Sequence, residues 1–387
     1  MIPWTYQSSG SSSDSGQDSN FQYYQPNPSL ILNSQTQCIA TINSPNAYTS
    51  SMVLSGKFLF TGSSDNQICL WRRNLFSTEL GHESSPVCNM GVPGKGVVKC
   101  LVVSTDKIFS AHQDHKIRVW RIDMDERENG KFTHLATLPK LSDRAMKFLV
   151  PKNHVEIRRH KKATWVHHVD SVSSLALSND ESLLYSVSWD KTIKIWRTHD
   201  FRCLESISKA HDDAINAVAI SLDGYVYTGS ADKRIKVWRK DSEEMKHYEV
   251  SILEGHNYGI NALALSTDEC QLYSGDSEGA IVVWQRVNDG DLVVAGALHG
   301  HSKSILCLAV ANDLVCSGSA DKTVKVWKPF EGLNSCLVTL EGHNGPVKCL
   351  AVANDQYQSS DSVSSCLIYS GGLDFEIKVW QVLVPNV

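Results

Sequence analysis

Histidine, a carboxylate and tryptophan recur in the same order along this chain of 387 residues. The five sets are His168, Asp190, Trp196; His211, Asp232, Trp238; His256, Glu278, Trp284; His301, Asp321, Trp327; and His343, Asp374, Trp380. With an intervening Ser or Thr, these are the ingredients of a catalytic relay, in which an acid orients a base that activates a hydroxyl. A catalytic group is needed only once, so the repetition favours a structural role for these buried imidazole and indole groups.

Two further motifs resemble chemical sites but lack the necessary spacing. Residues 91–96 read Gly-Val-Pro-Gly-Lys-Gly, whereas a phosphate-binding loop needs G-x-x-x-x-G-K followed by Ser or Thr. The pair His167–His168 has no companion ligands at metal-binding spacing. We therefore expect no catalytic residue, no metal site and no cofactor, which predicts a protein that is not an enzyme.

The element that must position these residues is an alternating apolar strand that ends in tryptophan. Successive tryptophans of this kind are 49, 76, 42, 46, 43 and 53 residues apart. A four-stranded propeller blade takes about 40–45 residues, so three intervals fit a blade and the others contain insertions. The sequence predicts an all-β, seven-bladed β-propeller. An acidic residue lies six positions before each of the seven tryptophans, which are Trp71, Trp120, Trp196, Trp238, Trp284, Trp327 and Trp380.

In these features the chain resembles the WD40 repeat family over roughly residues 36–382, and its wording around residues 157–197 is similar to plant JINGUBANG-type WD40 proteins. The resemblance implies that His, Ser or Thr, the acid and Trp form a hydrogen-bonded tetrad in each blade. Glu278 is then expected to replace the aspartate of blade 5. Blades 1 and 2 lack the histidine and are expected to be looser. The chain departs from the family by placing Arg, Lys or Gln after each tryptophan.

Composition limits the cellular compartments and the classes of partner that we expect for this protein. Apolar residues make up 42% of the chain and charged residues 20%, with a net charge of −5, so a large core is expected and general attraction to nucleic acid is not. Eleven cysteines without a Cys-x-x-Cys motif indicate buried thiols in a reducing compartment. Without a leader peptide or a membrane-spanning apolar run, we expect a cytoplasmic or nuclear location.

The two ends of the chain carry separate predictions. Residues 1–35 are rich in Ser, Gln and Asn and predict a disordered tail, which leaves residues 36–387 for the propeller. The chain ends just after the Trp380 strand, so blade 7 lacks a fourth strand of its own. Residues 36–42 read like the outer strands of other blades. We therefore predict that they pair antiparallel with the Trp380 strand and close the ring.

A basic insertion and one unusual tryptophan are the candidate binding residues. Residues 139–164 form an insertion between blades 2 and 3 that carries eight Lys or Arg and two acidic residues. The basic residues are densest at Arg158, Arg159, Lys161 and Lys162. Such a cluster is typical of nuclear localisation or of an anionic partner, or is simply a solvated loop. Trp189 stands where other blades have smaller residues, and we expect it partly exposed at the rim of the central channel, or packed under the insertion.

The function expected from this pattern is a protein–protein scaffold or regulatory adaptor in plant signalling, working as a monomeric platform for protein partners. The alternative is a binder of phosphate-rich ligands, nucleic acid or anionic lipid, through the basic insertion. Nucleic acid is the weaker choice because the charge is confined to one loop.

Overall fold

The computed structural model describes residues 34–385 except 45, 74–87, 92–95, 125–129, 141–153, 159–160, 165, 242, 244–245, 288–290, 331–332 and 355–362. The expected disordered tail at the N-terminus therefore lies, from residue 1 to 33, outside the described part. Among the described residues, no helix has the length and apolar character needed to cross a membrane.

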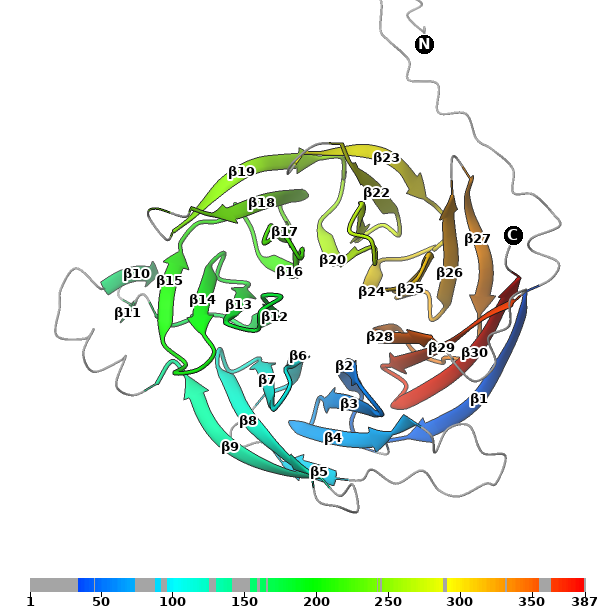
Figure 1. Ribbon diagram of the computed structural model, residues 1–387, viewed down its shortest axis with the longest axis horizontal. Coiled ribbons are helices and arrows are strands. Elements are labelled where there is room, and N and C mark those ends of the chain that lie inside the picture. Colours follow the sequence, from blue (N-terminus) through cyan, green and yellow to red (C-terminus); the bar gives the residue numbers. More distant parts are fainter. Residues whose placement is uncertain are drawn as a thin grey trace, which may run out of the picture.

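Seven four-stranded antiparallel sheets stand around a common axis, which confirms the predicted seven-bladed propeller (Figure 1). Blades 1 to 3 contain β2 (Thr49–Ser55), β3 (Phe58–Ser63), β4 (Gln67–Arg72) and β5 (Cys88–Gly91); β6 (Val98–Val103), β7 (Lys107–His112), β8 (Ile117–Met124) and β9 (Gly130–Leu138); and β12 (Val172–Leu177), β13 (Leu183–Ser188), β14 (Ile193–Arg197) and β15 (Cys203–Ile207).

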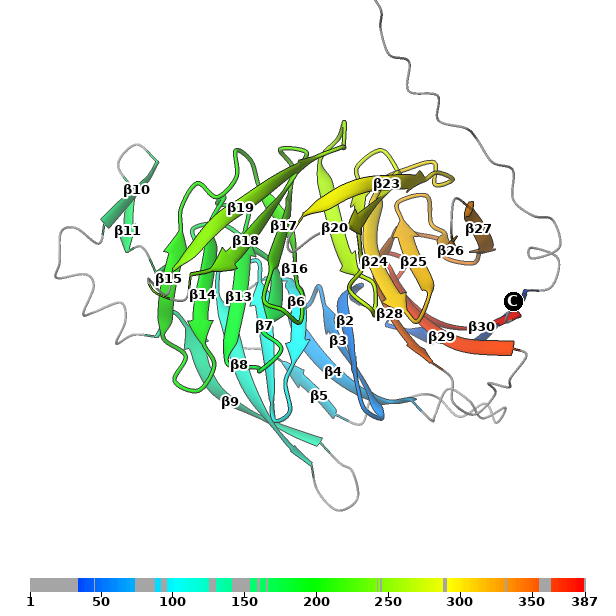
Figure 2. The same ribbon diagram turned by 45° about the horizontal axis from the view of Figure 1, so that its top comes forward.

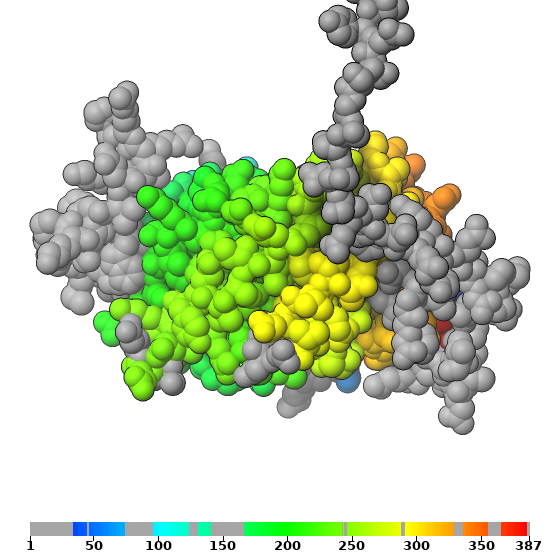
Figure 3. Space-filling view, turned by 90° about the horizontal axis from the view of Figure 1, so that it is seen from above, coloured from blue at the N-terminus to red at the C-terminus, as the bar shows by residue number. Residues whose placement is uncertain are grey.

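Blades 4 to 6 have the same order of strands from the axis outward. They contain β16 (Ile215–Ile220), β17 (Val226–Ser230), β18 (Arg234–Lys240) and β19 (His247–Glu254); β20 (Ile260–Leu265), β21 (Gln271–Asp276), β22 (Ile281–Arg286) and β23 (Leu292–Leu298); and β24 (Ile305–Ala311), β25 (Leu314–Ser319), β26 (Val324–Phe330) and β27 (Leu333–Leu340). Seen from the side, the outer surface of blades 3 to 5 is a continuous wall, coloured green to yellow in Figure 3.

Blade 7 takes strands from both ends of the chain. It consists of β28 (Val347–Asn354), β29 (Val363–Gly372), β30 (Glu376–Pro385) and, outermost, β1 (Gln35–Asn43). β1 pairs antiparallel with β30, with Cys38 opposite Trp380 and Ile42 opposite Ile377. This pairing confirms the predicted closure, which leaves no blade without its fourth strand (Figure 1).

The apolar core lies between neighbouring blades, because alternate residues of each strand face the sheet on either side. In one cluster, Val187 and Ile195 of blade 3 pack with Ile215, Val226 and Trp238 of blade 4. The tryptophan within each third strand is thus a core residue as well as a hydrogen-bond donor.

Side-chain hydrogen bonds also fasten each innermost strand to the innermost strand of the next blade. At four interfaces, Ser or Asn at the second strand position donates to the first carbonyl of the next strand: Ser50 to Val98, Ser173 to Ile215, Asn216 to Ile260 and Asn261 to Ile305. At the other three, a thiol from the third position donates: Cys100 to Leu175, Cys307 to Val347 and Cys349 to Thr49. All seven interfaces therefore carry such a bond around the axis.

Candidate functional site

Blade 4 shows the complete tetrad. The loop before β16 carries His211, whose Nδ1 lies 2.8 Å from Asp232 Oδ2 and whose Nε2 lies 2.8 Å from Thr228 Oγ1. The Trp238 indole N–H donates to the same hydroxyl at 2.9 Å, and Asp232 also accepts the backbone N–H of Asp212. The imidazole and the indole are buried. These bonds tie the loop entering β16 to the turn between β17 and β18 and to β18 itself.

The same hydrogen bonds occur in blades 3, 6 and 7. The distances from histidine Nδ1 to aspartate Oδ2 are 3.3 Å for His168 and Asp190, 2.8 Å for His301 and Asp321, and 2.9 Å for His343 and Asp374. The shared hydroxyls are Ser186, Ser317 and Ser370, which accept the indole N–H groups of Trp196, Trp327 and Trp380.

In blade 6, electrostatics favour a neutral imidazole and a charged carboxylate. Burial lowers the pKa of His301, although Asp321 acts in the opposite direction. Burial alone would raise the pKa of Asp321, but hydrogen bonds from Thr323 and His301 outweigh it and bring this pKa to about 2. A neutral imidazole donates through Nδ1 to the carboxylate and accepts through Nε2 from the hydroxyl, the tautomer that pairs every group. Such an arrangement fastens a loop and leaves no free base at neutral pH.

In blade 5 the prediction that Glu278 accepts the histidine hydrogen bond is wrong. His256 Nδ1 lies 3.0 Å from Asp276 Oδ2, and the Glu278 side chain is exposed. The other carboxylate oxygen of Asp276 accepts three successive backbone N–H groups, those of residues 278, 279 and 280. Asp276 is thereby fixed in the turn with Oδ2 facing the imidazole, so the longer Glu278 is not needed there. Ser274 completes the set by accepting from Trp284 at 2.7 Å.

Blade 2 has a histidine that the sequence pattern did not place. His112 lies on β7, and its Nε2 is 2.8 Å from Ser110 Oγ, which accepts the Trp120 indole N–H at 3.0 Å. Burial and the charge of Arg118 lower the pKa of His112 to about 3. Asp114, six residues before the tryptophan, pairs with Arg118 at 2.6 Å. The expectation that blade 2 has no tetrad histidine is therefore wrong.

Blade 1 keeps only the tryptophan end of the tetrad. The Trp71 indole N–H donates to Thr61 Oγ1 at 2.9 Å, while Asp65 is exposed and bonds to the Ser63 hydroxyl. No imidazole joins these groups in the part of blade 1 that the structure describes.

One position accounts for both differences. His112 and Asp276 each stand eight residues before the blade's tryptophan, where four other blades have serine and blade 7 has Gly372. A Cβ added at Gly372 would lie 2.7 Å from His343 Nδ1, so this position is within reach of the tetrad. A histidine or an acidic residue eight positions before the tryptophan is the sequence feature that identifies both His112 and Asp276.

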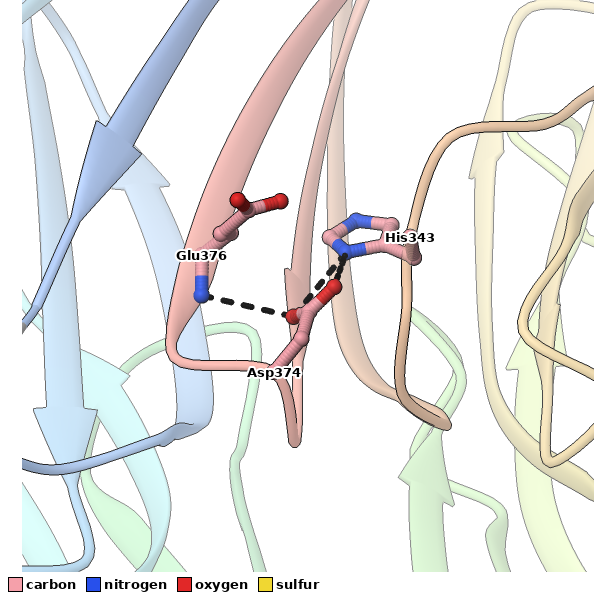
Figure 4. A group of neighbouring side chains, drawn as sticks. All are labelled: His343, Asp374 and Glu376. Atoms are coloured by element: carbon pink, nitrogen blue, oxygen red, sulfur yellow. Dashed lines mark hydrogen bonds and ion pairs between the residues drawn. The ribbon is translucent and has the colours of Figure 1, made fainter.

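His343, Asp374 and Glu376 bring three potential metal-ligand atoms within 4.8 Å of one another (Figure 4). His343 Nδ1 is already bound to Asp374, and the Glu376 backbone N–H donates to Asp374 Oδ1 at 3.3 Å. The Glu376 carboxylate pairs with Lys378 Nζ at 2.8 Å. Because His343 and Asp374 already bond to each other and the Glu376 carboxylate pairs with a lysine, we interpret the group as the blade 7 tetrad beside an ion pair.

Trp189 lies in the turn after β13, next to the innermost strands of two other blades. Its indole N–H donates to Asn216 Oδ1 at 3.1 Å, and the Lys99 ammonium stands 4.9 Å from the centre of its ring. The side chain is nevertheless 41% exposed. Trp189 is thus held in place by two contacts near the propeller axis while much of its surface faces solvent.

The basic insertion contains a short hairpin of its own. β10 (His154–Arg158) and β11 (Lys161–Thr164) pair antiparallel with Arg158 opposite Lys161, and Lys162 follows on β11. Arg159 lies outside the described residues. Both ribbon views draw the hairpin beyond β15, the outermost strand of blade 3 (Figures 1 and 2). The structure therefore does not bring this cluster and Trp189 into one surface.

Comparison with known families agrees with this architecture. The family model described as WD domain, G-beta repeat matches residues 36–72, 159–197, 201–239, 248–285, 290–328 and 334–381, more than half of the chain. The chain belongs to the WD40 repeat family. Most of these ranges run from the outermost strand of one blade to the third strand of the next, and the first joins β1 to blade 1. None covers β6 to β8 of blade 2, whose histidine comes from the strand and not from the preceding loop.

Among known WD40 and related proteins, the chain is similar to parts of several. It is 31% identical over 178 residues to "Zinc finger CCCH domain-containing protein 62" of Arabidopsis thaliana, covering 45% of this chain and 39% of that protein. An uncharacterized WD repeat-containing protein of Schizosaccharomyces pombe is 26% identical over 222 residues, 56% of each chain. A "U3 snoRNP-associated protein-like" protein of Arabidopsis thaliana is 28% identical over 183 residues, 42% of this chain and 37% of its own. The chain spans about half or less of these relatives.

Proposed function

We propose that this WD40 propeller is a non-catalytic scaffold or regulatory adaptor that binds partner proteins at the end of the propeller where Trp189 lies. The observation that carries the proposal is Trp189 itself, a tryptophan that is 41% exposed yet fixed by Asn216 and Lys99. Tryptophan is among the residues most enriched in interface hot spots, and a side chain already held in one conformation loses little entropy on binding.

The non-catalytic part of the proposal is supported by how the polar residues are used. The imidazoles of blades 3 to 7 are bonded to a carboxylate and a hydroxyl of their own blade, and the arrangement repeats. WD40 propellers usually serve as platforms for protein partners. We propose that it acts as a monomer in the cytoplasm or the nucleus. The likeness to JINGUBANG-type proteins favours a plant cell as the setting.

Quantitative affinity capture tests this proposal. The bait proteins are the full chain, Trp189→Ala and the control Tyr248→Ala, which removes a similarly exposed aromatic (48% exposed) from the outermost strand of blade 4. We expect Trp189→Ala to lose partners that Tyr248→Ala retains, with both variants melting near the wild-type temperature. Identical partner sets for all three baits would contradict the proposal.

The basic hairpin supports a second candidate function, the binding of phosphate-rich ligands. The register of β10 and β11 sets Arg158 opposite Lys161 and Glu156 opposite Lys162, so basic residues predominate in this hairpin, a composition typical of anion binding. The test is binding of labelled RNA and of anionic vesicles at rising salt, with Arg158, Arg159, Lys161 and Lys162 all changed to Ser. A steep salt dependence that the variant loses would favour this function. Salt-independent or unchanged binding would exclude the hairpin as its source.

A further inference from the structure

Two lysines occupy positions around the axis that other blades use for fastening. The second residue of the innermost strand is Ser or Asn in four blades, and each donates to the next blade. In blades 2 and 7 it is Lys99 and Lys348. The fastening of these two blades is provided instead by the thiols of Cys100 and Cys349. The lysines are therefore not needed to hold the ring together.

Neither lysine has an opposite charge beside it. Among the described residues, no carboxylate lies within ion-pair distance of Lys99 or Lys348, although both side chains are half-buried. The interaction recorded for the Lys99 ammonium is with the Trp189 ring. The strands that carry the two lysines, β6 and β28, both pack against β2 of blade 1. Burial, and next to it repulsion by Lys348, lower the pKa of Lys99. An anion beside such a half-buried ammonium group favours its charged form.

Apolar surface adjoins Lys99 and also lies near the start of β28, the strand that carries Lys348. Trp189 borders Lys99, and Leu373, 38% exposed, donates its backbone N–H to the carbonyl of Pro346, two residues before Lys348. A free phosphate would use the ammonium groups and leave this apolar surface uncovered. Extended nucleic acid needs a longer basic track than two lysines. A short protein segment that carries carboxylates beside apolar side chains fits both features.

We propose that Lys99 and Lys348, with Trp189 and Leu373 beside them, bind an acidic segment of a partner protein that also carries apolar side chains. This inference rests on the proposed function and names the class of partner for the same end of the propeller. The carboxylates pair with the two ammonium groups, and the apolar side chains cover the indole.

Fluorescence anisotropy with a labelled Glu-Leu-Glu-Leu-Glu-Leu peptide tests the proposal on the full chain. Lys99→Ser/Lys348→Ser installs the residue that blades 1 and 3 already have at this position, so the variant should melt no lower than wild type. The control Lys131→Ser/Lys240→Ser removes the same charge from β9 and β18. We expect the first variant to bind the peptide at least about tenfold more weakly and the control to bind it as wild type does.

Three results would overturn the proposal: no binding by wild type at low salt, equal affinity for the matched Gln-Leu-Gln-Leu-Gln-Leu peptide, or equal binding by the Lys99→Ser/Lys348→Ser variant. Lysine-dependent binding of inorganic phosphate that is as tight as that of the peptide would overturn the protein class of ligand and assign the site to free anions. If the peptide fails while Trp189→Ala still loses partners in affinity capture, the acidic ligand is wrong and the interaction platform stands.

Discussion

Replacing Asp321 with alanine tests the tetrad reasoning in blade 6, where the distance from histidine to aspartate is as short as in any blade. The carboxylate accepts from His301 Nδ1 at 2.8 Å, from the backbone N–H groups of Ser302 and Thr323 at 3.0 Å, and from the Thr323 hydroxyl at 2.7 Å. The His301 side chain is fully buried, so Asp321→Ala leaves its donor without the carboxylate. An unpaired buried polar group costs about 1–3 kcal/mol, and the lost bonds of the turn add about 1 kcal/mol.

The expected loss is therefore about 3 kcal/mol, or roughly 4 °C in melting temperature for a chain of this size. Asp65→Ala is the matched control, because Asp65 also stands six residues before its blade's tryptophan but is exposed and bonds to a serine. It should cost less than about 1 kcal/mol. Differential scanning fluorimetry at neutral pH compares the two. Equal shifts, or an unchanged melting temperature for Asp321→Ala, would refute the reasoning.

The same variant carries a pH prediction. The folded-state pKa of Asp321 is depressed from 3.8 to about 2, so its stabilising effect is present above pH 4 and is lost as the pH falls towards 2. The gap in melting temperature between wild type and Asp321→Ala should therefore shrink when both are measured near pH 3. A constant gap would contradict the charged state assigned to this carboxylate.

Three other predictions concern the positions where sequence and structure differ and the closure of the ring. Asp276→Ala should lower the melting temperature by several degrees while Glu278→Ala leaves it within about 1 °C, because only Asp276 bonds to the imidazole; the reverse order would restore the sequence-based assignment. Wild type should lose stability from about pH 6.5 downwards, since the folded-state pKa of His112 is lowered to about 3 and only the unfolded chain takes up the proton. His112→Gln should flatten this loss by up to about 1.4 kcal/mol per pH unit, and an unchanged slope in pH-dependent melting would speak against it. Removing residues 1–34 should preserve a monomer in size-exclusion chromatography, whereas removing residues 1–44 deletes β1 and should cause aggregation through the open edge of β30; equal behaviour of the two truncations would refute the closure.

The number of blades and their closure could be predicted because both depend on a repeated apolar pattern. Each blade buries its faces against two neighbours, so the alternating strand and its tryptophan must recur with every blade. The same requirement identified residues 36–42 as an outer strand that belongs to no blade next to it in sequence. In the structure β1 is the outer strand of blade 7 and pairs with β30.

Individual members of the tetrad were harder to predict, because a side chain can enter that space from more than one backbone position. Asp276 reaches His256 from two residues earlier than the aligned acid, and His112 reaches Ser110 from its own strand. Counting six residues back from the tryptophan cannot detect such exchanges. The roles of Cys100 and Cys349 depend on which carbonyl of the next blade lies nearby, which no local pattern records.

The hairpin β10–β11 and Trp189 show a second limit. The insertion leads into blade 3 and Trp189 lies in a turn of the same blade, so both were candidate binding residues. Trp189 is fixed by Asn216 and Lys99, which lie on the innermost strands of blades 4 and 2, whereas the hairpin lies outside β15 (Figure 1). The number of residues between two segments does not predict whether an insertion lies near the propeller axis or outside the outermost strand.

Site-specific photocrosslinking in living cells tests the central claim most directly. A benzoylphenylalanine placed at Trp189, and in a control chain at Tyr248 on the outermost strand of blade 4, reports which proteins touch each of these two surfaces, since both side chains are exposed. The account predicts discrete protein adducts from position 189 that exceed those from position 248. Adducts confined to position 248, or no protein adduct from position 189, would contradict binding at the Trp189 end of the propeller.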